Sequence, residues 1–421
     1  MDVLSLILFV AIIALAFWRK TNMGVLAFAA AMILGRALGM SDKEIVKGLS
    51  SSLFVTLTGI TLLFAAVNST GALEMISKKI ISLVGKRIYI LPIVSYLLGF
   101  VLAVIGPGAI PPTTLTVTMC VSMALAAGYN PIMMGVIGGL GLMGGRVTAI
   151  TPEGNLVSTL AAEQGIAGNV IVPVFAFQVI TTILYSVALF FVFKGHKVKA
   201  EQLDESLTKK VKATPNQIIS LLGIVVMLVM VTIFKMDVGL SAFLVAGLLF
   251  IFNIAEDSTS IKAIPWGTIT MILGVGVLMN VIKSAGGIDL LCSLLSSFMS
   301  KSTAAAFTGI TSGVMSLVSS GLGVVYPTLI PMATQLAESV GGALPVAIIA
   351  AIVAGGSLAG FSPMSTCGAL TLSSIAAIRK DLTKAESSKM FIQLFVVALV
   401  AVLWVGVSSM IFANLCVNLF A

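Results

Sequence analysis

The chain has 421 residues, of which 58% are hydrophobic and 10% charged, and its mean hydropathy is +1.15. A soluble protein carries about a quarter charged residues, so this composition excludes an ordinary soluble domain and predicts an all-α polytopic membrane protein. The net charge of +8 does not indicate nucleic-acid binding, because the basic residues lie in short segments between apolar runs, where they orient a membrane protein.

In chain order, the apolar runs of the first half predict spans at 2–18, 23–40 and 50–68, an amphipathic or hairpin segment at 70–86, a span at 88–105 and a closing helix at 170–193. The corresponding segments of the second half are 217–234, 238–254, 266–283, 285–300, 303–320 and 388–418. No basic segment precedes the run at 2–18, so we expect a retained span rather than a signal peptide.

These segments correspond because the sequence repeats internally. NSTGALEM at 68–75 resembles KSAGGIDL at 283–290, an offset of 215 residues. The same offset aligns several glycines, namely Gly24 with Gly239, Gly59 with Gly274 and Gly106 with Gly321. We therefore expect a first repeat at 1–193, a linker at 194–215 and a second repeat at 216–421.

The placement of lysine and arginine predicts the orientation. In the first half, the basic groups 19–20 and 78–87 share one side with the linker if the N-terminus is outside and the linker is cytoplasmic. In the second half, Lys301 alone remains of the second group, whereas Arg379 and Lys380 follow the last apolar break. The excess of lysine and arginine thus lies at different segments of the repeat in the two halves. This difference predicts two repeats of inverted topology, as in secondary transporters.

Four breaks interrupt the apolar runs in two matched pairs, at 105–114 and 319–328 and at 145–155 and 356–366. Each combines Gly or Pro, which end a helix, with Ser or Thr. Non-helical backbone survives at membrane depth only inside protein or beside a cavity, and the N-termini of half-helices attract anions. One such break would be a simple kink, but four at matched positions favour a binding site between re-entrant hairpins and broken helices.

Arg146 and Glu153 are the only charged residues between 88 and 162. A charge at this depth is expensive and usually faces a site or a partner. Arg146 is suited to hold a substrate carboxylate through two parallel hydrogen bonds. The alternative is that it pairs with Glu153 or reaches the membrane surface. The equivalent positions of the second half, Ser357 and Met364, are neutral.

Other motifs indicate no catalytic chemistry. The four cysteines have neither metal nor disulfide spacing, and GLGLMG at 139–144 lies in an apolar run without the strand that a dinucleotide site requires. Glu74 and Asp289 suit the first turn of a helix, with proton coupling as the alternative. No nucleophile–base pair is present, so we expect no enzyme activity and no cofactor beyond coupling to sodium or protons.

The segments NMGVLAFAAAMILG at 22–35 and LFVTLTGITLLFAAVNSTGALEMI at 53–76 resemble the dicarboxylate carrier (malonate carrier) family. This family belongs to the ion transporter superfamily, together with the divalent-anion/sodium symporters. The resemblance implies paired hairpins, substrate between the hairpin tips, a homodimer and an elevator mechanism.

The symporters carry a Ser-Asn-Thr motif at each tip, where this chain has IGPGAIPPT at 105–113 and SSGLGVVYPT at 319–328. Asparagine is missing from both, which leaves sodium coupling, proton coupling and exchange open. The candidate substrate-binding residues at the tips and breaks are Gly106, Pro107, Gly108, Thr113, Thr114, Arg146, Thr151, Pro152, Ser319, Ser320, Gly321, Thr328, Ser362, Pro363, Ser365 and Thr366. The candidate cation ligands are Gly106, Thr148, Asn155, Ser320, Gly323 and Gly360.

The expected function is secondary active transport of a small dicarboxylate, such as malonate or a C4 acid, across the inner (plasma) membrane. One alternative is the large membrane subunit of a binding-protein-dependent carrier of organic acids. Another is a cation/proton antiporter, which the scarcity of acidic residues in the spans disfavours.

Overall fold

The computed structural model describes residues 1–19, 21–82, 88–106, 108–166, 168–198, 212–363, 365–379 and 381–420. Every regular secondary-structure element in these ranges is a helix, so the predicted all-α fold class is confirmed. Most of the predicted linker lies outside the described residues, as do Lys20, Lys86, Arg87 and Lys380 from the orientation argument.

The first half forms ten α-helices and two short 3₁₀ turns in the described residues. They are α1 (Asp2–Arg19), α2 (Met23–Ala37), α3 (Asp42–Val46), α4 (Ser51–Ser69), α5 (Ala72–Ser82), η1 (Ile88–Ile90), α6 (Leu91–Val104), α7 (Ile110–Ala127), α8 (Pro131–Gly145), α9 (Pro152–Ala162), α10 (Ile171–Val192) and η2 (Gly195–Lys197).

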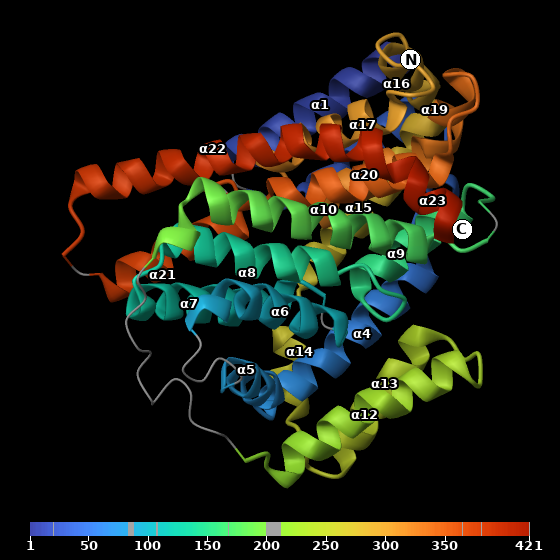
Figure 1. Cartoon of the computed structure of the whole chain (residues 1–421). Helices are drawn as coiled ribbons and strands as arrows, with labels where there is room; N and C mark the ends of the chain where they lie inside the picture. Colours follow the sequence, from blue (N-terminus) through green and yellow to red (C-terminus); the bar gives the residue numbers. More distant parts are fainter. Residues whose placement is uncertain are drawn as a thin grey trace.

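The second half follows the same order. Its elements are α12 (Pro215–Thr232), α13 (Val238–Ile251), α14 (Asp257–Ala263), α15 (Trp266–Ser284), α16 (Gly287–Ser296), α17 (Ala304–Val318), η3 (Gly321–Val325), α18 (Tyr326–Leu329), η4 (Ile330–Met332), α19 (Ala333–Ser339), α20 (Pro345–Leu358), η5 (Ala359–Phe361), α21 (Thr366–Ile378), α22 (Lys384–Ser408), η6 (Ser409–Ala413) and α23 (Asn414–Phe420). The first residues of α4 and α15 differ by 215, the offset of the sequence repeat (Figure 1).

Six helical stretches in the described part of the chain are long and apolar enough to cross a membrane, by length and composition. They are Ser51–Ser69, Ile171–Val192, Pro215–Thr232, Trp266–Ser284, Pro345–Ile378 and Lys384–Phe420. The protein is an integral membrane protein.

The predicted breaks are shorter in the structure than in the sequence analysis. Helix α7 already begins at Ile110, and only residues 319–320 separate α17 from the π-helical turn η3. The reason is that the prolines of these segments stand in the first turn of α7 and α18. A proline in the first turn has no hydrogen bond to lose and favours the start of a helix.

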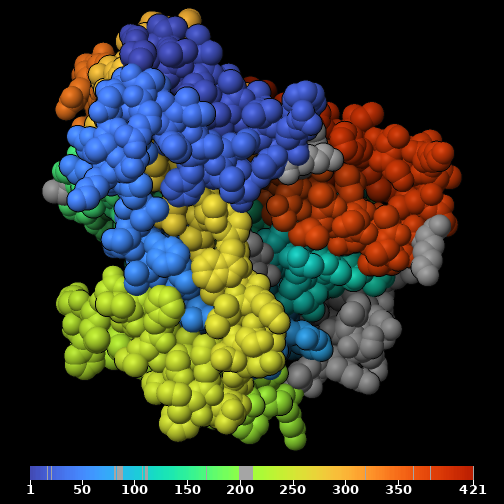
Figure 2. Space-filling view, turned by 180° about the vertical axis from the view of Figure 1, so that it is seen from behind, coloured from blue at the N-terminus to red at the C-terminus, as the bar shows by residue number. Residues whose placement is uncertain are grey.

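Two close helix crossings join the halves. At the first, a Cβ on Gly274 of α15 would lie 2.2 Å from the carbonyl oxygen of Gly24 in α2. At the second, a Cβ on Gly59 of α4 would lie 2.3 Å from the carbonyl oxygen of Gly239 in α13. Gly24 is the repeat equivalent of Gly239 and Gly59 that of Gly274, yet Gly24 contacts Gly274 and Gly59 contacts Gly239. Each crossing therefore pairs one helix of the first half with one helix of the second. Seen from behind, the N-terminal helices border the yellow segments of the second half (Figure 2).

The hairpins and broken helices form a second group, in which α6 packs on α8 and α17 on α20. Polar contacts fix this group across the halves: Tyr185 Oη of α10 donates to the Val397 carbonyl of α22 (2.6 Å), and Trp404 Nε1 of α22 donates to the Thr181 carbonyl of α10 (3.0 Å). The chain therefore separates into crossing helices on one side and hairpins with broken helices on the other.

Candidate functional site

The breaks of both halves meet around one buried ion pair. Arg146 follows the last turn of α8, and Glu153 stands in the first turn of α9. Arg146 Nη2 lies 3.2 Å from Glu153 Oε1, and the two side chains are 7% and 1% exposed. Among the described residues, no other ion pair has both side chains buried. The structure therefore pairs the two charges that the sequence analysis singled out.

The Glu153 carboxylate also binds the first hairpin tip. The backbone N–H of Ala109, which precedes α7, donates to Glu153 Oε1 at 3.0 Å. Gly108 has a φ of +68°, and a Cβ there would lie 2.0 Å from Glu153 Oε2. The carboxylate thus lies at the N-termini of α7 and α9, where the helix dipoles favour a negative charge.

The second half closes the other side of this centre. Tyr326, fully buried in α18, donates its hydroxyl to the Val353 carbonyl (2.9 Å), and Ser357 donates to the same phenol oxygen (2.8 Å). Cys367, in the first turn of α21, lies next to Thr113 of α7. Tyr326 and Cys367 both lie near Arg146.

Several polar atoms at this centre lack a partner among the described residues. Arg146 Nε has none, and Nη1 contacts only the Met143 sulfur at 3.1 Å. Glu153 Oε2 and the Thr148 hydroxyl are also buried without a partner. Since buried polar groups are normally hydrogen-bonded, these atoms have the capacity to bind a further polar ligand.

Most predicted hydroxyl ligands instead bind their own backbone. Thr113 and Thr328 donate to the carbonyls of Ala109 and Val324 one turn earlier, and Ser319 donates to the Met315 carbonyl. Thr114 and Thr366 are exposed, Pro152, Ser362 and Pro363 are buried, and Gly321 is half-buried. Pro107 lies outside the described residues.

The break residues Thr151, Ser320 and Ser365 order their loops. Thr151 accepts from the Gly154 N–H (3.1 Å), and Ser320 accepts from the Gly323 N–H (3.0 Å). Ser365 donates to the Gly360 carbonyl. Asn155 donates to the carbonyls of Ala149 and Thr151, both at 3.0 Å. The cation role of Gly106, Thr148, Asn155, Ser320, Gly323 and Gly360 stays a prediction.

Both hairpin tips rest against the crossing helices. A Cβ on Gly106 would lie 2.0 Å from the ring of Phe64 in α4. A Cβ on Gly323 would lie 2.4 Å from the Met271 sulfur in α15. Because α4 and α15 occupy equivalent places in the two halves, each tip meets one of an equivalent pair of helices.

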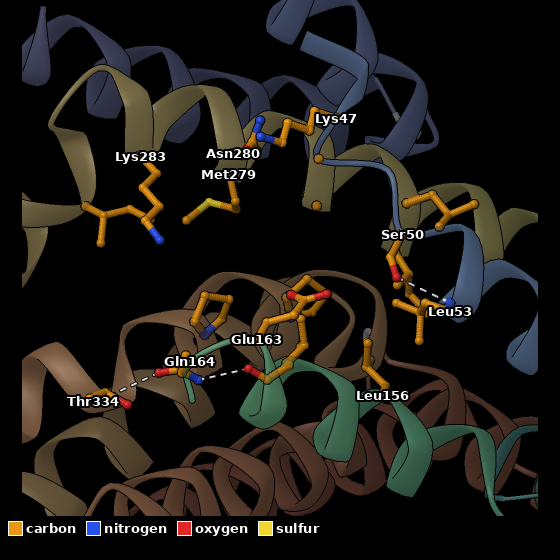
Figure 3. Close-up of a pocket in the computed structure, with 18 of the residues that line it drawn as sticks. Lys47, Ser50, Leu53, Leu156, Glu163, Gln164, Met279, Asn280, Lys283 and Thr334 are labelled. Carbon is orange, nitrogen blue, oxygen red and sulfur yellow. Dashed lines mark hydrogen bonds between the residues drawn. The ribbon is translucent and has the colours of Figure 1, made fainter. Parts of the chain in front are cut away.

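A cavity of about 570 Å³ lies between the two groups of helices. Its walls come from the α3–α4 connection and α15 on one side and from α9, α18 and α19 on the other (Figure 3). Pro327, which also lines it, belongs to the second tip segment 319–328, so the cavity reaches that segment. This cavity could not be predicted from the sequence, because its polar residues belong to separate segments and each resembles an ordinary helix end.

Comparisons with known proteins agree with this architecture. Residues 1–146 match the family described as the N-terminus of the dicarboxylate carrier protein MatC. No curated protein sequence matches the chain. The crystal structure of the Alcanivorax borkumensis YdaH transporter superposes with a TM-score of 0.59 at 12% sequence identity, covering 97% of this chain and 99% of that chain.

At this identity the second comparison shows the fold alone. The predicted resemblance to dicarboxylate carriers is confirmed over residues 1–146. The match over residues 1–146 is to a carrier family, in agreement with the expectation of a transporter rather than an enzyme.

Proposed function

We propose that the protein is a secondary active transporter of a small dicarboxylate, malonate or a C4 acid, held between the two hairpin tips with one carboxylate on Arg146. The observation that carries this proposal is the incomplete hydrogen bonding of the buried Arg146 guanidinium. A guanidinium has five N–H donors, and Glu153 accepts from one of its nitrogens at 3.2 Å. A substrate carboxylate would use the remaining donors.

The position of Arg146 supports this role. It lies beside half-helix N-termini of both halves, whose N–H groups and dipoles favour anions. Burial in a region of low dielectric makes a charged hydrogen bond stronger than in water. A ligand with two carboxylates would also contact the second tip, where Gly321 lies against Gly356 of α20.

We further propose that the halves, 1–193 and 216–421, are inverted repeats and that transport uses an elevator movement. The hairpins and broken helices would move against the crossing helices, which include α2, α4, α13 and α15. The repeated element order and the two glycine crossings support this assignment. The N-terminus is then outside the cell membrane, the 194–215 linker is cytoplasmic, and two copies form a homodimer.

Transport of a dianion against a negative-inside potential requires coupling. Each charge moved against 100 mV costs about 2.3 kcal/mol. Co-transported sodium or protons, or exchange for another anion, would offset this. The unpartnered Thr148 hydroxyl is a candidate oxygen ligand for a small cation.

The test is uptake of labelled malonate and succinate into proteoliposomes, with sodium gradients, proton gradients and internal dicarboxylate imposed separately. We expect saturable uptake under at least one of these conditions and counterflow of the same substrates. If neither compound enters under any gradient and no counterflow occurs, the proposed substrate class is wrong.

A further inference from the structure

The charges around the cavity are separated by sign. Both of its lysines, Lys47 after α3 and Lys283 in α15, belong to the wall formed by the crossing helices. Both of its acids, Glu163 after α9 and Glu338 in α19, belong to the opposite wall. Figure 3 shows Lys47 and Lys283 extending from the upper wall and Glu163 from the lower. The cavity therefore has one cationic and one anionic wall.

These four side chains form no ion pair with one another, although Lys283 and Glu163 interact electrostatically across the cavity. All four are exposed, and none forms an ion pair with another described residue. The same wall also carries the polar side chains of Ser50 and Asn280. Ammonium groups with neighbouring hydroxyl and amide donors are suited to carboxylates. A hollow with low-dielectric walls also concentrates the field of its charges more than a flat surface does.

We propose that Lys47 and Lys283 form a second anion-binding site, a docking station for organic carboxylates at the mouth of the cavity and separate from Arg146. The cavity also reaches Pro327, in the second tip segment 319–328. The acids of the opposite wall repel the ligand, so it is held against the lysine wall. For a transported dicarboxylate the station deepens the proposed function, since it would raise the local substrate concentration before the ligand reaches Arg146.

The test measures the local potential with charged thiol reagents, and it does not require transport. The four native cysteines are buried, so a new cysteine supplies the reactive thiol. In Ser50→Cys, on the lysine wall, we compare the labelling rates of a sulfonate and a trimethylammonium methanethiosulfonate. Both rates are normalised to a free thiol in solution. We expect the normalised anion-to-cation ratio to exceed one by about 25-fold, because one charge about 4 Å away in water speeds the anion and slows the cation by about fivefold each.

Two variants in the Ser50→Cys background show which lysines cause this preference. Lys47→Gln together with Lys283→Gln should bring the ratio close to one. Lys262→Gln should leave it unchanged, because Lys262 is the repeat counterpart of Lys47 and lies outside the cavity. A ratio of one or less in Ser50→Cys overturns the proposal. An equal loss in Lys262→Gln also overturns it, since the effect would then reflect the net charge of the protein.

A cysteine on the other wall tests the polarity. Gln335 lines the cavity on α19, and Gln335→Cys should favour the cationic reagent. The same preference at both walls contradicts the separation of charges. Because Ser50 caps α4, Asn280→Cys is a second position on the lysine wall if Ser50→Cys does not fold.

The outcome for the station and the outcome for the carrier can be told apart. Failure of malonate and succinate uptake, with the anion preference intact, refutes the substrate proposal and leaves the station supported. Uptake with no anion preference at residue 50 refutes the station and leaves the carrier supported. Protection of the new thiol by malonate supports both.

Discussion

Arg146 and Glu153 stabilise each other, so neither can be tested alone. Removing one partner of a buried ion pair leaves an uncompensated charge and destabilises a protein by about 3–5 kcal/mol. Arg146→Gln would therefore lower stability even if Arg146 never touched substrate. The double variant Arg146→Gln with Glu153→Gln removes both charges and retains side chains of similar size, so we expect it to fold.

In this double variant we expect the KM for dicarboxylate uptake to rise roughly tenfold to a hundredfold, the effect of losing a hydrogen bond to a charged group. Uptake kinetics and thermal unfolding in detergent should be measured on the same preparation. Glu153→Gln alone serves as a control for KM but not for stability, because it keeps Arg146 and an acceptor for the Ala109 N–H yet leaves the guanidinium unpaired. An unchanged KM in the double variant would limit Arg146 to a structural role.

At the scale of one element, the first hairpin tip depends on Gly108. Both Gly108 and Gly128, at the two ends of α7, have positive φ, at +68° and +76°. Alanine costs about 1 kcal/mol in this conformation at either position. A Cβ at Gly128 has no neighbour within 4 Å, whereas at Gly108 it would displace the Glu153 carboxylate.

We therefore expect Gly108→Ala to lower the thermal unfolding midpoint clearly more than Gly128→Ala. The difference should be about 1.5–3 kcal/mol, the usual effect of a lost hydrogen bond to a charged group. Thermal unfolding of both variants in detergent measures it. Equal shifts would mean that contact between the tip and Glu153 adds nothing to stability.

Sequence patterns predicted where the helices break, but not the local conformation of the breaks or the contacts made there. Apolar runs and Gly-Pro clusters are local, so α4, α6, α10 and α15 begin and end near their predicted bounds. The prolines were misleading, because a proline inside an apolar run looks like a helix stop and here begins a helix. The Arg146–Glu153 pair was only one alternative, since seven residues of sequence separation across a break do not fix a distance.

At the scale of the whole molecule, the assembly of the halves depends on contacts that repetition alone does not specify. The offset of 215 residues aligned Gly24 with Gly239 and Gly59 with Gly274, yet the structure places Gly24 against Gly274 and Gly59 against Gly239. A repeat shows which residues are equivalent, not which ones touch. The cavity was missed for the same reason, because its charged residues come from both halves.

The crossing of α2 and α15 predicts opposite effects of one substitution at two glycines. Gly274 contacts the Gly24 backbone, whereas a Cβ on Gly247 in α13 would have no neighbour within 4 Å. Alanine is a better helix former than glycine by about 0.8–1 kcal/mol, so Gly247→Ala should keep or raise the unfolding midpoint. Gly274→Ala should lower it, since overpacking costs about 1–3 kcal/mol.

The same prediction applies to the second crossing, between α4 and α13. Gly59→Ala forces a Cβ against the Gly239 backbone as Gly274→Ala does against Gly24, so the two should destabilise by similar amounts. Because both crossings join the halves, combining the two substitutions should also lower the fraction of folded, monodisperse protein recovered in detergent. Thermal unfolding and gel filtration measure these effects. If Gly274→Ala and Gly247→Ala gave the same midpoint, close backbone packing at the α2–α15 crossing would not be what holds the two halves together.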